Sequence, residues 1–321
     1  MNRQHWQGKF KHTALYLLVT LLSFSFVAAC GEPEGEERTV TAKVFLEIDD
    51  FEYLRGQGAL VLDARGASNF TDGHVPGAVN AAWKAFVYPD KNGIVLDSAA
   101  DLQVAARSLG INNDQTVLIY GDGGKGDSAA GRLFWTLEYI GHPSVYLLNG
   151  GIEAYKKANL TTEAGTTTAA TGTFTVKLRP EIRATQAEVL AASQNGTLKL
   201  IDSRTDAEYD GDLEDAVRRG NTVAGHIPQA VHYHWEDVIS ADGVLRPKAE
   251  IRAELLALGI NETSLTIPYC QSGVRSGFLY AVLQWLEFPA AKNYDGSWWE
   301  WSRTEGLPIE DRHEVEVVVE N

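Results

Sequence analysis

The feature that most constrains the fold of this 321-residue chain is one order of motifs that occurs twice. In each copy a short apolar run, typical of a buried strand, ends in Asp-x-Arg, and a Gly-His-x-Pro-x-Ala turn follows. A second apolar run, a loop and a helical run come next in both copies. Strand and helix runs that alternate in this way are typical of parallel sheets covered by helices. The sequence therefore predicts an α/β fold with two tandem units, each a mainly parallel β-sheet flanked by helices.

The elements of both copies can be placed along the chain. The first copy has a strand leading into a helix at 44–54, expected strands at 59–63, 116–120 and 145–148, and expected helices at 102–109 and 129–140. The second copy has expected strands at 198–202 and 265–269 and expected helices at 249–258 and 277–286. An extra polar stretch at about 210–224 occurs in the second copy, and we expect it to be a loop.

The repeat also sets the expected domain boundaries. The segments are a signal peptide at 1–29, a tether at 30–39, an N-terminal domain at 40–160, a linker at 161–179, a C-terminal domain at 180–310 and a tail at 311–321. The tether is rich in Glu, Gly and Pro, and the linker is rich in Thr, Ala and Gly, so neither supports a packed element.

The N-terminus has the pattern of a secretory signal, with basic residues before an uncharged, mostly apolar run at 13–29. Small residues precede Cys30, and residues 27–30 resemble the lipobox of bacterial lipoproteins, although Val27 stands where Leu is usual. The resemblance implies cleavage before Cys30, its diacylation, and a lipid anchor that holds an exported protein on the periplasmic or extracytoplasmic side of a membrane. An uncleaved anchor and a plain signal peptide are the alternatives.

Charge and cysteine count exclude several classes of function. The net charge of −15 argues against a nucleic-acid-binding protein and against a polybasic membrane-binding surface. Two cysteines, Cys30 and Cys270, are too few for a disulfide framework or a cysteine-rich metal site. If Cys30 carries a lipid, Cys270 has no intramolecular thiol partner in an oxidising compartment, which suits a working residue.

Cys270 stands where an apolar strand run ends and a helical run begins. A free thiol titrates near 8.5, and loop N–H groups, a helix dipole and a cation such as Arg275 can lower its pKa to between roughly 3.5 and 7.5. We therefore predict Cys270 as the nucleophile. The expected substrate-binding residues are the rest of its loop, namely Gln271, Ser272, Gly273, Val274 and Arg275. A buried structural cysteine is the alternative.

The duplicated set of motifs resembles that of the tandem rhodaneses, the family of thiosulfate and 3-mercaptopyruvate sulfurtransferases. The resemblance covers about residues 40–310 and implies a catalytic C-terminal copy and an N-terminal copy without its cysteine. Alignment of Tyr120-Gly121-Asp122 with Pro268-Tyr269-Cys270 places Asp122 opposite Cys270. The N-terminal domain is therefore expected to be catalytically silent.

The resemblance also implies a double displacement that needs no metal or organic cofactor. The Cys270 thiolate attacks the outer sulfur of a small anionic donor such as thiosulfate, sulfite leaves, and a persulfide remains on the cysteine. Loop amides and Arg275 would hold its negative charge. Cyanide or a thiol acceptor then takes the sulfur.

Two features of the loop, and one residue outside it, bear on the substrate. The six residues from Cys270 to Arg275 are one fewer than in rhodanese-like phosphatases, which disfavours phosphate chemistry. Gln271 departs from the Cys-Gly-[Ser/Thr]-Gly of mercaptopyruvate enzymes, which favours thiosulfate, with 3-mercaptopyruvate as an alternative. Glu208 stands where related two-domain enzymes place an arginine, so a persulfide or polysulfide donor is a further alternative. A non-enzymatic persulfide carrier is the alternative from another class of function.

Other motif residues are expected to be structural. His74 and His226 occur in both copies, including the one without a cysteine, which indicates a role in a turn. The Asp-x-Arg pairs are expected to form ion pairs at strand ends. The loop at 121–128 fails the Walker pattern for phosphate binding. The tryptophans at 298, 299 and 301 belong either to the core or to the wall of a pocket.

Overall fold

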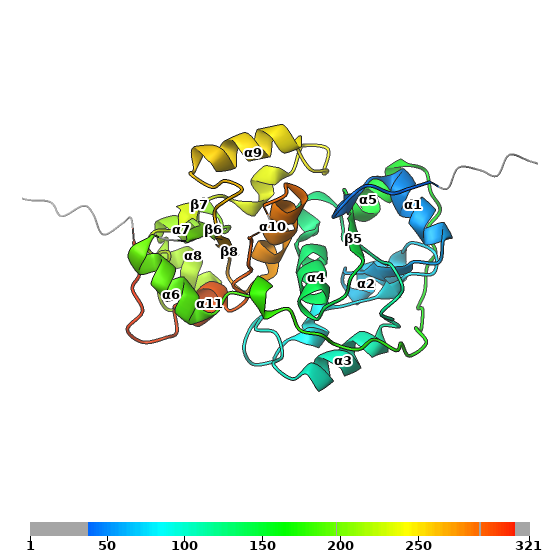
Figure 1. Cartoon of the computed structure of the whole chain (residues 1–321), viewed down its shortest axis with the longest axis horizontal. Helices are drawn as coiled ribbons and strands as arrows, with labels where there is room; N and C mark the ends of the chain where they lie inside the picture. The colour runs from blue at the N-terminus through cyan, green and yellow to red at the C-terminus, as the bar shows by residue number, and fades with distance from the viewer. Residues whose placement is uncertain (1–37, 197, 289, 312–321) are drawn as a thin grey trace, which may run out of the picture. The chain divides into compact units, whose positions relative to one another are not determined.

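The computed structural model describes residues 38–311, apart from residues 197 and 289, and the statements below concern those residues (Figure 1). The described residues from Val40 onward belong to one compact unit. The expected signal peptide and Cys30 lie outside the described residues. Within the described part of the chain, no helix has the length and apolar character needed to cross a membrane.

The first half of the structure is built on a five-stranded sheet in which every pair of strands is parallel, in the order β1-β5-β4-β2-β3. Its elements are β1 (Phe45–Leu46), α1 (Ile48–Gly56), β2 (Leu60–Asp63), α2 (Ala67–Asp72), β3 (Val79–Asn80), α3 (Ala99–Ser108), β4 (Val117–Tyr120), α4 (Ser128–Tyr139), β5 (Val145–Leu148) and α5 (Gly151–Lys157). Two 3-10 helices, η1 (Trp83–Phe86) and η2 (Gly124–Gly126), interrupt its loops.

The second half repeats this plan on a three-stranded parallel sheet in the order β7-β6-β8. Its elements are η3 (Pro180–Ile182), α6 (Gln186–Asn195), β6 (Lys199–Asp202), α7 (Asp206–Asp210), α8 (Leu213–Arg218), β7 (Val231–His232), η4 (Trp235–Val238), α9 (Lys248–Ala257), β8 (Thr266–Tyr269), α10 (Val274–Trp285) and α11 (Ser297–Trp301). Where the first sheet has β1 and β5, the second has only single parallel bridges, Arg183 with Asn293 and Thr266 with Ala291.

The predicted fold class is confirmed, and one local expectation is wrong. The extra polar stretch at about 210–224 contains the helix α8 rather than an open loop. Asp212 caps this helix by accepting a hydrogen bond from the backbone N–H of Asp215. The Asp215 carboxylate then pairs with Arg218 and Arg219, so the polar residues satisfy one another in a helical turn.

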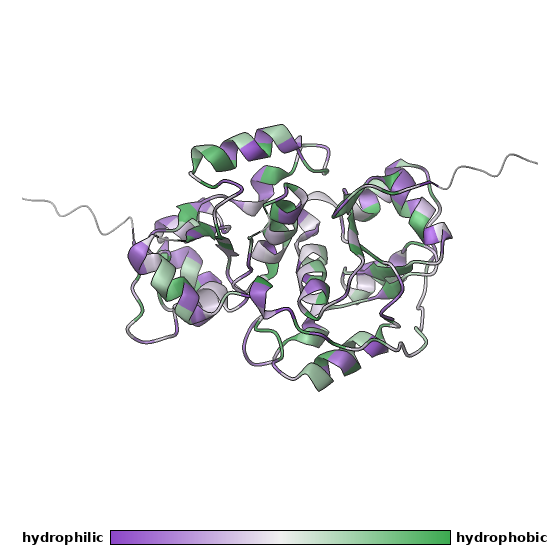
Figure 2. Ribbon diagram, viewed as in Figure 1, coloured by the Kyte–Doolittle hydropathy of each residue, from purple (hydrophilic) through white to green (hydrophobic). Residues whose placement is uncertain are grey.

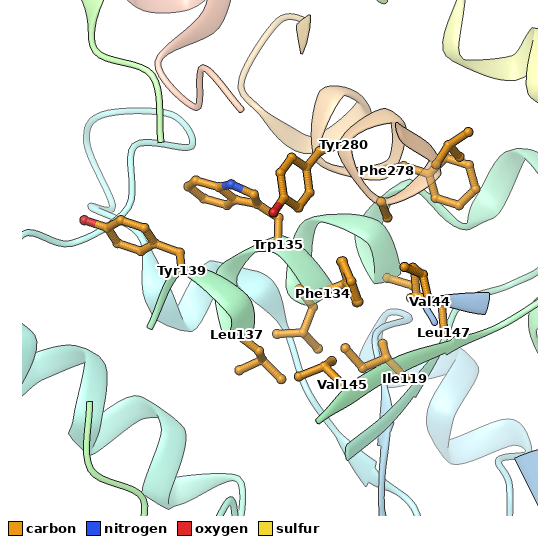
Figure 3. Packing of buried hydrophobic residues seen from close by; sticks show 14 of the residues in the cluster. Val44, Ile119, Phe134, Trp135, Leu137, Tyr139, Val145, Leu147, Phe278 and Tyr280 are labelled. Carbon is orange, nitrogen blue, oxygen red and sulfur yellow. The ribbon is translucent and has the colours of Figure 1, made fainter. Parts of the chain in front are cut away.

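The outer helices and the shared core differ in character. Figure 2 shows that hydrophobic and hydrophilic residues alternate along α3 and α9, as expected for helices with one buried face. By contrast, α4 and α10 lie side by side and are largely buried, so they join the two halves of the structure (Figure 1). Figure 3 shows aromatic side chains of both helices in this core, with Trp135 from α4 and Phe278 from α10.

Two glycines allow α4 and α10 to approach closely. A Cβ atom on Gly131 would collide with the backbone of Phe278, and a Cβ on Gly277 would lie 3.0 Å from Cα of Arg132. The two contacts are reciprocal, because each glycine faces the residue that follows its counterpart. Glycine at these positions therefore sets the distance between the helices.

The motif histidines and the Asp-x-Arg pairs are structural, as predicted. Nδ1 of His74 lies 2.8 Å from the carbonyl oxygen of Phe70, and Nδ1 of His226 lies 2.7 Å from that of Tyr209. The His74 ring also stacks on the Phe70 ring, and the His226 ring stacks on the Tyr209 ring. The two buried Asp-x-Arg pairs form ion pairs of 2.6 Å (Asp63 with Arg65) and 2.5 Å (Asp202 with Arg204).

Two of the three tryptophans near the C-terminus take the first predicted role, in the core. Trp298 and Trp301 are fully buried in the core of the second half. Trp299 is half-buried, and the Arg303 guanidinium lies 3.2 Å from its ring centre. The first two therefore belong to the core. Trp299 lies beside the Cys270 loop, where its backbone N–H donates to the carbonyl of Gln271.

Candidate active site

Cys270 follows the last residue of β8, a strand that is buried along its whole length. The strand end is fixed by Tyr269, whose hydroxyl donates to Oδ2 of Asp202 at 2.7 Å and accepts the N–H of Ile227 at 3.1 Å. Asp202 is the last residue of the neighbouring strand β6, so the carboxyl ends of two parallel strands meet at the cysteine. This is the edge of an open α/β sheet where ligands usually bind. The side chain of Cys270 is buried, with 1% exposure.

Ser297 organises the Cys270 loop from the turn at residues 295–298, which we call the closing turn of the second half; residues 149–152 form that of the first half. The backbone N–H groups of Cys270 and Gly273 both donate to Oγ of Ser297, at 3.1 and 3.0 Å. Ser297 holds a positive φ of 52°, which is rare for a residue other than glycine and indicates backbone strain at this point. Its hydroxyl donates to the carbonyl of Tyr294 at 2.7 Å. The sequence assigned no role to this serine.

The electrostatic surroundings of the thiol favour its ionised form. Burial raises the pKa of Cys270, but the Arg275 guanidinium, the Ser276 backbone amide and hydroxyl, and the Ser272 amide together hold this pKa below its ordinary value. Oγ of Ser276 lies 3.6 Å from Sγ of Cys270 and 2.7 Å from Oδ1 of Asn293. The loop therefore provides hydrogen-bond donors and a cation for a thiolate, as the sequence predicted.

The cation of the loop has a carboxylate partner that the sequence did not predict. Nη1 and Nη2 of Arg275 bind Oε2 and Oε1 of Glu208 at 2.7 and 2.8 Å, a bidentate pair. Burial raises the pKa of Glu208, but its pairing with Arg275 outweighs this and lowers that pKa to about 2. Glu208 is therefore ionised at neutral pH, and it takes up the charge that was expected to hold a substrate anion.

A capping box fixes Glu208 in this place. The hydroxyl of Thr205 accepts the N–H of Glu208 at 3.3 Å, and the Glu208 carboxylate accepts the N–H of Thr205 at 3.1 Å. This box starts α7 just after the end of β6. The Thr-x-x-Glu spacing is a recognisable sequence signal for a helix start. Because β6 pairs with β8, a helix that starts just after β6 lies near Cys270, and so does its residue Glu208.

The remaining predicted loop residues take distinct positions. The side-chain amide of Gln271 exchanges two hydrogen bonds with that of Asn221, at 2.8 and 3.0 Å. The carbonyl of Ser272 faces Gly93 of the first half so closely that a Cβ atom there would collide with it. Gly273 has a positive φ of 74°, and Val274 is the first residue of α10.

The counterpart of this site in the first half corrects the sequence alignment by one residue. The Tyr120 hydroxyl donates to Oδ2 of Asp63 at 2.6 Å and accepts the N–H of Val75 at 3.1 Å, which matches the bonds of Tyr269. Tyr120 therefore corresponds to Tyr269, and Gly121, not Asp122, stands opposite Cys270. The alignment was wrong because it paired Tyr120, the last residue of its strand, with Pro268, the next-to-last residue of β8.

A carboxylate fills the place where a side chain at position 121 would lie. A Cβ atom on Gly121 would collide with Oδ1 of Asp127, and this oxygen accepts the N–H of Gly123 at 2.9 Å. Burial raises the pKa of Asp127 to about 7. The loop of the first half is thus longer: Gly131 stands ten positions after Gly121, whereas Gly277 stands seven positions after Cys270.

The fold and this site define a two-domain α/β protein with a buried, acidified cysteine at a strand end. The chain belongs to the rhodanese family: the sequence model of the rhodanese-like domain matches residues 48–158 and 185–304. The family includes sulfurtransferases that match most of this chain.

Three relatives illustrate the similarity. The chain is 35% identical over 252 residues to the sulfur carrier protein TtuD of Thermus thermophilus, which covers 75% of this chain and 86% of that protein. It is 32% identical over 253 residues to a thiosulfate sulfurtransferase of Pseudomonas aeruginosa, covering 78% of this chain and 90% of that protein. The crystal structure of SseA from Escherichia coli, described as a 3-mercaptopyruvate sulfotransferase, superimposes with a TM-score of 0.69 at 27% identity, covering 80% of this chain and 99% of that one.

Proposed function

We propose that this chain is a sulfurtransferase that moves a sulfane sulfur through a persulfide on Cys270, with thiosulfate or a similar anion as donor and cyanide or a thiol as acceptor. The observation that carries the proposal is the buried thiol whose pKa is lowered by Arg275 and by loop hydrogen bonds. Membership of the rhodanese family and the similarity to thiosulfate sulfurtransferases support it.

The reaction proceeds in two displacements. In the first, the Cys270 thiolate attacks the outer sulfur of thiosulfate, a new S–S bond forms, and sulfite leaves with the electron pair of the old bond. In the second, the acceptor attacks the terminal sulfur of the persulfide, and the thiolate leaves. The Ser272 and Ser276 amides that favour the thiolate also favour the anionic persulfide, so the loop stabilises both resting states.

The choice of donor depends on Glu208. Because its carboxylate binds both Nη atoms of Arg275, a thiosulfate dianion meets a cation that is already paired. This arrangement supports a persulfide or polysulfide as the alternative donor. Similarity to a 3-mercaptopyruvate sulfurtransferase of Escherichia coli, at 30% identity over 249 residues, supports mercaptopyruvate as another.

A persulfide carrier is the second candidate function. The relative at 35% identity is described as a sulfur carrier, and the 1% exposure of Cys270 suits a sulfur that is protected until a partner arrives. Turnover separates the candidates, because an enzyme regenerates free Cys270 with a small acceptor, whereas a carrier keeps its sulfur.

Steady-state assays test the proposal. Thiosulfate, mercaptopyruvate and polysulfide would each be supplied with cyanide, and thiocyanate would be measured for the chain and for Cys270→Ser. We expect multiple turnovers with at least one donor and none for the variant. Loading of Cys270 with sulfur but no thiocyanate from any donor would assign the chain to the carriers.

We also propose that the protein is exported and anchored by a lipid on Cys30. The support is the pattern of residues 1–30, which lie outside the described residues. Labelling of cells with a radioactive fatty acid tests this. We expect label on the wild type and none on Cys30→Ser, whereas equal label on both would reject the anchor.

A further inference from the structure

A buried arginine of the first half reaches the Cys270 loop. Arg132 belongs to α4, and its side chain is fully buried. Its Nη1 donates to the carbonyl of Gly273 at 3.1 Å, and its Nη2 donates to the carbonyl of Gly93 at 2.5 Å. The backbone N–H groups of Gly273 and Cys270 share the Ser297 hydroxyl, so Arg132 binds the same short loop.

The guanidinium of Arg132 has no carboxylate partner among the residues that the structure describes. The nearby carboxylate of Asp295 accepts the N–H of Val95 at 2.8 Å and Nε of Arg183 at 2.9 Å instead. Nε of Arg132 itself is buried without a hydrogen-bond partner. The Trp135 ring, with its centre 4.8 Å from Cζ of Arg132, offsets only part of the cost of burying this charge.

The two arginines at the loop therefore differ in the charge that they offer. Arg275 is closer in sequence to Cys270, but both its Nη atoms bind Glu208. Arg132 binds only neutral carbonyl groups, so its positive charge is not cancelled by a direct ion pair. A buried, unpaired cation lowers its own free energy when an anion forms nearby.

We propose that Arg132 is a positioning residue of the Cys270 site, through which the first half of the chain fixes the loop at Gly273 and supplies positive charge to the thiolate and the persulfide. The proposal rests on the proposed function only in taking Cys270 as the sulfur-bearing residue. It gives the first half, which has no cysteine in its own loop, a direct part in the chemistry of the second.

The electrostatics of Arg132 agree with this geometry. Burial lowers the pKa of Arg132 to about 10, and the charges of Asp295 and Cys270 oppose that shift. Interaction between two titrating sites is reciprocal, so a thiolate that stabilises the guanidinium is stabilised by it to the same extent.

The test is the ionisation of Cys270 in the full chain carrying Cys30→Ser. The thiolate would be followed against pH by its ultraviolet absorbance relative to Cys270→Ser. We expect Arg132→Gln to lower the thiolate fraction at a pH below the midpoint severalfold, because it removes a buried positive charge that interacts with Cys270. Arg132→Lys should keep most of it. Arg65→Gln removes a buried guanidinium at the other loop and should leave Cys270 unchanged.

A second measurement needs no charge-removing variant. In chain labelled at arginine nitrogen, the Nε resonance of Arg132, identified by its loss in Arg132→Lys, should shift as Cys270 ionises and should stay constant in Cys270→Ser. An Arg132 resonance that does not shift as Cys270 ionises would overturn the proposal. A folded Arg132→Gln variant whose thiolate fraction follows the same pH curve as the wild type would also overturn it. Sulfur loading by thiosulfate is measured separately, so failure of the proposed function would be seen as no added sulfur in any variant.

Discussion

The loop at Gly121 and the loop at Cys270 have the same backbone frame but enclose different side chains. In both, a tyrosine hydroxyl fixes the strand end, and the closing turn donates a backbone N–H to the first loop residue, from Ile152 to Gly121 and from Trp298 to Cys270, each at 2.9 Å. The first loop encloses a carboxylate of its own chain, and the second encloses a thiol. The comparison teaches that the fold builds the same loop frame at both sites but favours an anion only at Cys270, because the pKa of Asp127 is raised and that of Cys270 is lowered.

The contacts between the halves are also reciprocal. The N–H of Val95 in the first half donates to the Asp295 side chain at 2.8 Å, and the N–H of Leu245 in the second half donates to the Asn149 side chain at 2.9 Å. Asp295 and Asn149 hold matching places in the closing turns. Each half therefore supports the other's loop, but the closing-turn residue that does so is charged only beside the cysteine-bearing loop.

Moving the cysteine from the second loop to the first should have the largest effect on activity. In Gly121→Cys combined with Cys270→Ser, we expect complete loss of sulfur transfer, because Asp127 occupies the space and adds a negative charge beside the new thiol. Thiocyanate production measures this. Recovery of activity in the double variant would show that the two loops are equivalent.

Disturbing the contact between α4 and α10 should have the next largest effect, on stability. Gly131→Ala should lower the free energy of unfolding by about 2–3 kcal/mol, because the added methyl group collides with the backbone of Phe278. Gly56→Ala is the matched control: it lies at the end of α1, where an added Cβ atom would meet nothing within 4 Å, and it should be neutral or slightly stabilising. Denaturant unfolding of both variants compares them, and equal stabilities would refute the tight contact.

The Asp127 carboxylate predicts a pH-dependent difference in stability. An aspartate in an unfolded chain titrates near 3.9, whereas burial raises the pKa of Asp127 to about 7 in the folded chain. Between these values the folded state binds more protons, so its stability falls as pH rises. Asp127→Asn removes this dependence, and we expect it to be about 1–3 kcal/mol more stable than the wild type at pH 8, with the difference vanishing toward pH 4.

Unfolding of both proteins across this pH range measures the effect. Asp122→Asn, in the same loop, should reproduce only a small part of it, because the Asp122 charge is a minor cause of the raised pKa of Asp127. A gap between wild type and Asp127→Asn that stays constant with pH would contradict the raised pKa.

The smallest expected effect is that of Glu208 on the KM for thiosulfate. Glu208→Gln frees Arg275, so we expect KM for thiosulfate to fall about threefold to tenfold, which corresponds to roughly 1 kcal/mol. Glu188 completes the equivalent capping box on α6 and pairs with Lys292, away from Arg275. Glu188→Gln should therefore leave KM unchanged, and an unchanged KM in Glu208→Gln as well would remove Glu208 from donor selection.

The sequence predicted the elements whose signals are local. Apolar runs ending in Asp-x-Arg placed β2 (Leu60–Asp63) and β6 (Lys199–Asp202), and the polar residues around Cys270 predicted its acidified loop. It missed α8 because four acidic residues between 210 and 215 suggest a solvated loop, although their caps and ion pairs form a helix. It missed the reach of Arg132, because that contact joins residues 141 positions apart and depends on two glycines that bring α4 to α10.

A persulfide on Cys270 is tested most directly by intact-protein mass spectrometry of the full chain carrying Cys30→Ser, after incubation with thiosulfate and then with cyanide. We predict a gain of the mass of one sulfur atom, its removal by cyanide, and no gain in a chain that also carries Cys270→Ser. A sulfur that adds equally to both chains, or that adds to neither with thiosulfate, mercaptopyruvate or polysulfide, would contradict a persulfide on Cys270.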